Sequence, residues 1–153
     1  MPRQPGARRR ASAGGWPAGL VAYYPLDEAG PAVRDASGSG NDGESHGARF
    51  AEAGAVGGCF EFRGGPDEGD FIRVPHSASL VSMQETRELT LCAWIRPRSI
   101  PREFPVVLGK GGNQPPDCDG GYELYINSYG DDDLTVVGDT IVFLTKGAGG
   151  RLV

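Results

Sequence analysis

The stretch that decides the fold is Asp35-Ala36-Ser37-Gly38-Ser39-Gly40-Asn41-Asp42-Gly43. Almost every residue in it favours a bend: glycine adopts positive φ without steric cost, while Asn and Asp tolerate the left-handed region and hydrogen-bond their own backbone. A strand-like segment precedes it and an extended one follows, so we predict a rigid polar loop. Its many oxygen atoms suit a hard cation such as calcium. A tight connection without an ion is the alternative.

Composition places the chain among globular β proteins. Its 153 residues suit one domain. Gly at 25 and Pro at 12, together with 39% hydrophobic residues, favour short strands joined by many turns. The net charge of −5 argues against a general nucleic-acid partner.

Short apolar runs recur between the Gly- and Pro-rich turns. The clearest is 88–97, where Leu89, Leu91, Ala93 and Ile95 alternate with Thr90, Cys92, Trp94 and Arg96. Both of its faces are largely apolar, so we expect a central strand with Trp94 in the core. Further strands are expected at 19–26, 57–62, 70–75, 106–110, 122–127 and 140–146. With no amphipathic helix of useful length, the pattern predicts an all-β antiparallel sandwich.

The N-terminal region differs from the rest. We predict a flexible basic tail at residues 1–18 and the β-sandwich domain at residues 19–153. The basic start is followed by small residues broken by Gly and Pro, so we expect no signal peptide. No apolar run approaches the ~20 residues of a transmembrane helix, so we expect no membrane insertion.

Common catalytic and metal signatures are absent from the sequence. Cys59, Cys92 and Cys118 are too widely spaced for a zinc motif, and we expect the first two to be buried. The two histidines, His46 and His76, have no recognisable triad partners. The run Gly38-Ser39-Gly40-Asn41-Asp42-Gly43 matches GxGxxG, but no helical pattern follows it, as a dinucleotide site requires.

Aromatic side chains can stack on sugar rings. Trp94 is expected in the core, whereas Tyr125 and Tyr129 lie near a loop. These two tyrosines are the candidate ligand-binding residues.

Four segments, taken in order, resemble the laminin-G-like, concanavalin A-like jelly-roll domains, most closely the bacterial type. They are 20–28, 35–43, the pair 60–62 and 70–77, and 89–97. The resemblance covers roughly residues 19–146. The later strands of the family have no counterpart here. The resemblance therefore implies an antiparallel jelly roll that is incomplete at its C-terminus, as a fragment or completed by another chain.

The resemblance also implies a function. It indicates a non-catalytic recognition module that binds a carbohydrate or an extracellular protein, outside the cell or at its surface. A fragment of a related glycoside hydrolase and a purely structural module are the alternatives. A hydrolase needs paired carboxylates, but the nearest candidate, Glu68-Gly69-Asp70-Phe71-Ile72-Arg73, has Arg in place of the second Glu. We therefore expect no enzyme.

The family often holds a structural calcium near the first loop. Carried over to this chain, Asp35 would supply a carboxylate ligand, and Asn41 and backbone carbonyls of Ser37 or Gly43 part of the shell. Calcium takes six to eight oxygen ligands. A further acidic ligand of the family comes from the closing strand, so the site expected here is incomplete.

Overall fold

The computed structural model describes residues 16–63, 69–98, 106–111, 121–127 and 140–145. The chain divides into two compact units, Met1–Leu80 and Val81–Val153. Each unit is described by itself.

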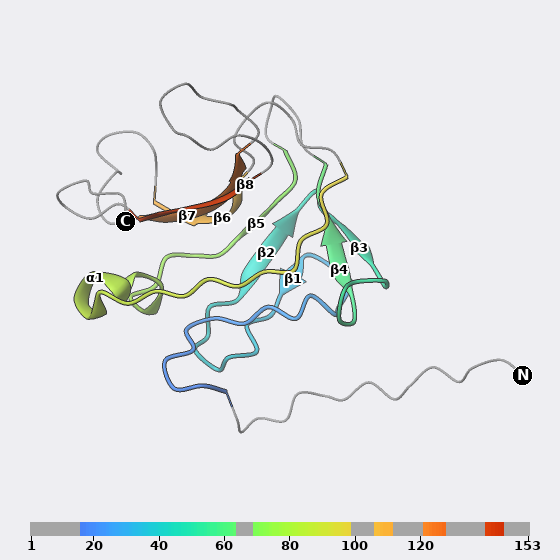
Figure 1. The fold of residues 1–153 in the computed structure, drawn as a ribbon. Coiled ribbons are helices and arrows are strands. Elements are labelled where there is room, and N and C mark those ends of the chain that lie inside the picture. Colours follow the sequence, from blue (N-terminus) through green and yellow to red (C-terminus); the bar gives the residue numbers. More distant parts are fainter. Residues whose placement is uncertain (1–15, 64–68, 99–105, 112–120, 128–139, 146–153) are drawn as a thin grey trace, which may run out of the picture. The chain divides into compact units, whose positions relative to one another are not determined.

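The first unit contains a three-stranded antiparallel sheet in the order β1-β2-β5 (Figure 1). These strands are β1 (Ala32–Val33), β2 (Gly43–His46) and β5 (Phe71–Arg73). Glu44 of β2 lies opposite Ala32 on one side and Arg73 on the other. Side chains alternate along each strand, so the opposite face carries Val33 and Ile72. Val33 is only 4% exposed, which places the core on that face.

A separate hairpin joins β3 (Arg49–Ala51) to β4 (Cys59–Glu61), and the two strands lie side by side in Figure 1. Phe50 faces Phe60 across it, with the rings edge to face and their centroids 5.9 Å apart. Phe60 is 9% exposed and Cys59 half-buried. An edge-to-face aromatic pair contributes roughly 0.5–1.5 kcal/mol beyond the area it buries. A short 3-10 helix, η1 (Ser79–Val81), follows this unit's sheets.

The turn of this hairpin is held by a carboxylate from the preceding segment. Asp27 Oδ1 accepts a hydrogen bond of 2.7 Å from Gly58 N. Gly57 has φ +76°, and a Cβ there would overlap the Asp27 carboxylate. Glycine is therefore needed at 57 for both its conformation and its lack of a side chain.

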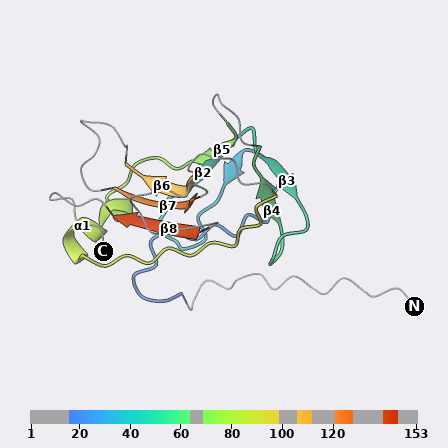
Figure 2. The same ribbon diagram turned by 45° about the horizontal axis from the view of Figure 1, so that its top comes forward.

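The second unit contains α1 (Met83–Thr86) and an antiparallel sheet in the order β6-β7-β8 (Figure 2). Its strands are β6 (Val106–Lys110), β7 (Tyr122–Asn127) and β8 (Thr140–Thr145). Tyr125 of the central strand pairs with Val106 and Val142 and is 8% exposed. The predicted strands at 106–110 and 122–127 are confirmed, as is the strand predicted at 140–146 over its described residues 140–145. Shorter versions of the strands predicted at 57–62 and 70–75 are also found.

Two predicted strands are not found. Residues 19–26 and 88–97 have no strand pairing with any described residue. The first ends at Leu26, whose φ of 58° turns the chain out of the extended region. The second has the right alternation, but a strand also needs a hydrogen-bonding neighbour, which its own sequence does not specify.

The burial expected of 88–97 is wrong as well. Trp94 is 84% exposed and Cys92 is exposed, whereas Cys118 lies outside the described residues. Apart from these differences, the described chain is mostly strands in small antiparallel sheets with almost no helix. The all-β prediction is therefore confirmed. None of the described helices is long and apolar enough to cross a membrane.

Candidate functional site

The Asp35 carboxylate organises the loop at 35–43. Its Oδ1 accepts hydrogen bonds from the backbone N–H groups of Tyr23 and Ser37, each at 2.9 Å. Its Oδ2 accepts from the Ser37 hydroxyl at 2.9 Å and from Asn41 N at 3.0 Å. Each oxygen therefore takes two donors, and together they join the segment before the loop to both ends of the turn.

These donors set the charge state of Asp35. Burial is the largest single influence and raises the pKa of the carboxyl. The hydrogen bonds from Tyr23 N–H, the Ser37 hydroxyl and N–H, and Asn41 N–H act against it. Together they outweigh burial and hold the pKa of Asp35 below its ordinary value. The group is thus an anion at neutral pH.

Asn41 is the buried centre of the same network, at 3% exposed. Its Nδ2 donates to Val21 O at 2.8 Å and to Ser79 Oγ at 3.0 Å. Its Oδ1 accepts from the Ser77 hydroxyl, and its backbone carbonyl accepts from Tyr24 Oη at 2.6 Å. Every polar group of its side chain is therefore satisfied, as a buried amide requires.

Ser77 and Ser79 close this network into a ring. Their hydroxyl oxygens are 3.0 Å apart. If Ser79 donates to Ser77, then Ser77 donates to Asn41 Oδ1 and Asn41 Nδ2 donates to Ser79, so each hydroxyl donates once. A chain of hydrogen bonds with one direction polarises its members and strengthens them.

Trp16 packs on the loop from the segment that we predicted to be part of a tail. Its Nε1 donates to Ala36 O at 3.1 Å, and its ring lies 4.5 Å from that of Tyr23, centroid to centroid. Ala36 N in turn donates to Tyr23 O at 2.8 Å. Residues 1–15 lie outside the described part of the chain. Nothing in the local pattern singles out Trp16, because its partner is 20 residues away.

Three of the four residues predicted to bind calcium, Asp35, Ser37 and Asn41, share one hydrogen-bond network. The side-chain oxygens of Asp35 and Asn41 already accept hydrogen bonds in it. Gly43 lies in β2, paired with Val33. A Cβ on Gly43 would come 3.1 Å from Arg73 O and Val74 Cγ2, so glycine serves close packing here. The two expected side-chain ligands, Asp35 and Asn41, are thus engaged by donors of the chain itself.

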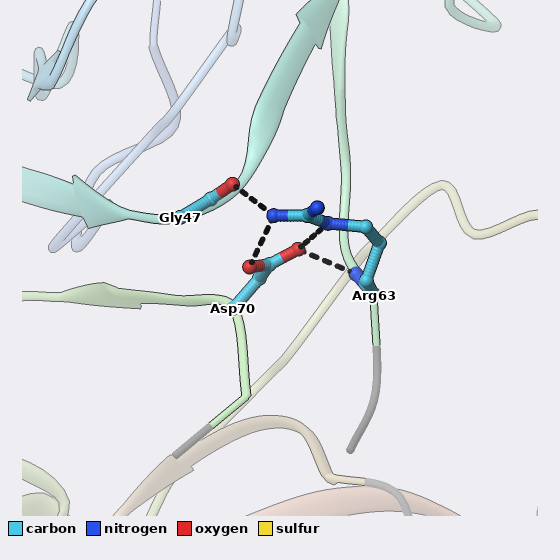
Figure 3. A network of polar contacts seen from close by, with 3 residues as sticks. All are labelled: Gly47, Arg63 and Asp70. Carbon is cyan, nitrogen blue, oxygen red and sulfur yellow. Dashed lines mark hydrogen bonds and ion pairs between the residues drawn. The ribbon is translucent and has the colours of Figure 1, made fainter. Parts of the chain in front are cut away.

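A second polar cluster joins Arg63 to Asp70, which flank residues 64–68 (Figure 3). Asp70 Oδ2 accepts from Arg63 N at 2.7 Å and Arg63 Nε at 3.1 Å, and Arg63 Nη2 reaches Gly47 O at 3.4 Å. The Arg63 side chain lowers the pKa of Asp70, and Asp70 raises the pKa of Arg63. A carboxyl held ionised in this way is poorly suited to act as a general acid. Glu68, its predicted neighbour, lies outside the described residues.

The outer face of β2 and β5 carries a third cluster. His46 stacks on Phe71 with centroids 4.6 Å apart, and Arg73 Cζ lies 5.3 Å from the centroid of the same ring. Glu44 Oε2 is 3.9 Å from His46 Nε2. His46 stands opposite Phe71 in the register, as a cross-strand pair does, whereas Glu44 and Arg73 each lie two residues along the strand from the ring that they contact. The cluster stabilises the sheet and leaves the Phe71 ring covered by its neighbours.

Large apolar side chains are exposed in several places. The most exposed is Trp94, on the extended segment 88–98, followed there by Ile95 at 39%. Tyr125, expected to be accessible to a ligand, is instead buried in β7, because that strand is the middle one of its sheet. Tyr129 lies outside the described residues. Among the described aromatic residues of the second unit, the most exposed is thus the one that we had expected in the core, Trp94.

No protein-family model, curated protein or solved structure matches this chain.

Proposed function

We propose that the chain is a non-catalytic recognition module of laminin-G-like, concanavalin A-like jelly-roll type, which binds a carbohydrate or protein ligand outside the cell. The exposure of Trp94 carries the proposal. Trp94 is 84% exposed on an extended segment, so most of its indole side chain faces water. Tryptophan is enriched at interfaces, because it combines a large apolar ring with a polar N–H group.

The size of the side chain makes Trp94 an effective contact. Burying a tryptophan removes roughly 150–250 Å² from water. At about 25 cal/mol per Å² this is worth about 4–6 kcal/mol before the costs of ordering and desolvation. Truncating an aromatic at the centre of an interface therefore costs about 2 kcal/mol or more, which is about 30-fold in affinity.

Two kinds of ligand suit this surface. A sugar ring can stack on the flat face of the indole. Alternatively, the extended segment 88–98, which pairs with no described strand, can accept a strand from another chain through backbone hydrogen bonds. The second possibility corresponds to a partner that completes the sheets.

The experiment compares wild type with Trp94→Ala on a glycan array and in titrations with neutral oligosaccharides. Trp16→Phe is the control, because Trp16 packs on Tyr23 and, at 38% exposed, is much less accessible than Trp94. Binding that Trp94→Ala weakens about 30-fold and Trp16→Phe preserves would support the sugar ligand. The protein ligand would be favoured if no glycan on the array is bound and the chain instead self-associates with rising concentration or binds a defined strand peptide. Glycan binding that Trp94→Ala leaves intact would refute the role of this surface.

A further inference from the structure

We infer that the loop at 35–43 is a metal-independent cradle, in which four hydrogen-bond donors of the chain stabilise the negative charge of the Asp35 carboxylate in place of a calcium ion. The resemblance to a calcium-binding family implies an ion at this loop. In this structure the negative charge of the Asp35 carboxylate is stabilised by hydrogen bonds from the chain itself. The inference is independent of the proposed ligand.

The Asp35 carboxylate already accepts as many hydrogen bonds as its two oxygens can take. An ionised carboxylate offers about four lone-pair sites. Four donors fill them here: Tyr23 N–H, Ser37 N–H, the Ser37 hydroxyl and Asn41 N–H, all within 3.0 Å. A cation needs those lone pairs free, at 2.3–2.6 Å for calcium. Hydrogen atoms that point at the same oxygens repel a cation from them.

Two neighbouring oxygens, Asn41 Oδ1 and Val21 O, are engaged too. Asn41 Oδ1 accepts from Ser77 Oγ, and Val21 O accepts from Asn41 Nδ2 at 2.8 Å and from Ser37 Oγ at 3.3 Å. To bind calcium, the loop would have to break bonds that also tie Asn41 into the core. A structural ion adds stability only where its ligands have no better partners.

One consequence concerns recognition. Because no ion is needed to shape the loop, ligand binding by this module should survive EDTA. The cradle should also exist in the absence of any ligand, since its donors come from the chain itself.

The test is a calcium titration of the ¹⁵N-labelled full chain by NMR, which follows the amides of Tyr23, Ser37 and Asn41. The backbone amide of Arg63 is an internal reference, because it also donates a hydrogen bond to a carboxylate, Asp70 Oδ2, at 2.7 Å. We expect millimolar calcium, or EDTA, to move the three amides no more than the Arg63 amide. We expect Asp35→Asn to shift all three upfield and to leave the Arg63 amide in place.

Either of two results would overturn the inference. A saturable calcium shift of the three amides, absent for Arg63, would show that the ion takes the carboxylate. Unmoved amides in Asp35→Asn would show that the cradle does not form. If that variant does not fold, the wild-type titration still decides the question.

Discussion

Replacing Asn41 with Ala tests the buried network most directly. The side chain is 3% exposed and bonds the carbonyl of Val21 and the hydroxyls of Ser77 and Ser79. Alanine removes the bonds of Asn41 to these three groups, although Val21 O keeps a longer bond from Ser37 Oγ at 3.3 Å and the two hydroxyls can still bond each other. Each orphaned group costs about 1–3 kcal/mol. The two hydroxyls can rotate towards other acceptors, so we take the lower value for each and expect a loss of about 3 kcal/mol.

The assay is urea denaturation followed by the fluorescence of Trp16. Trp16 packs on Tyr23 beside the loop, and Trp94→Phe as background removes the second tryptophan from the signal. A loss of 3 kcal/mol moves the midpoint by about 1–3 M, since m is about 1–3 kcal/mol per M for small proteins. An unchanged slope would show that the denatured state is the same in both variants.

Ser39→Ala is the control in the same loop. Ser39 is exposed and its hydroxyl makes one long hydrogen bond of 3.4 Å, to Leu20 O. Its replacement should change stability by less than about 0.5 kcal/mol. An Asn41→Ala variant as stable as Ser39→Ala would refute the reasoning, because the ring would then contribute nothing that water cannot replace.

Three further predictions concern other sites. Gly57→Ala should lower the free energy of unfolding by more than about 1 kcal/mol, because φ is +76° and a Cβ meets Asp27; equal urea midpoints would contradict this. The folded-state pKa of Asp35 lies below its ordinary value of 3.8, so the stability from this group is complete above that value and is lost as pH falls through the folded-state pKa. The urea midpoint should therefore fall below about pH 4, and less steeply in Asp35→Asn; parallel curves for the two proteins would be the contrary result. Trp94→Ser should change the free energy of unfolding, followed by thermal denaturation, by less than about 0.5 kcal/mol, since the side chain is 84% exposed. A larger loss of stability would mean that the indole is buried after all.

The strands that could be predicted from the sequence are those whose signal is local. β7 alternates apolar and polar residues through Tyr122, Leu124 and Ile126, and its bounds agree with the prediction. Segment 88–97 has an equally clear alternation, yet it has no described partner strand and exposes Trp94. Alternation reports which side chains could share a face. It does not report whether a neighbouring strand is present to cover that face.

The candidate site shows the same division. Asp35 could be chosen from the turn chemistry around it, and its bond to Ser37 N, two residues on, is the local type that such turns make. Asn41 could be named, but its role could not, because its partners Ser77 and Ser79 lie 36 and 38 residues away. Trp16 was assigned to the tail for the same reason. Contacts of long sequence separation leave no local signal.

The exposed segment 88–98 also bears on how the protein behaves at high concentration. Residues 89–95 form an uncharged run without proline, rich in residues that favour strands. Runs of this kind template intermolecular stacking when their backbone is accessible. Glu88 precedes the run, and Arg96-Pro97-Arg98 follows it, so charges and a proline close both ends. Flanking charges and prolines limit the self-assembly of such runs, so replacing these four residues should lower the protein's solubility.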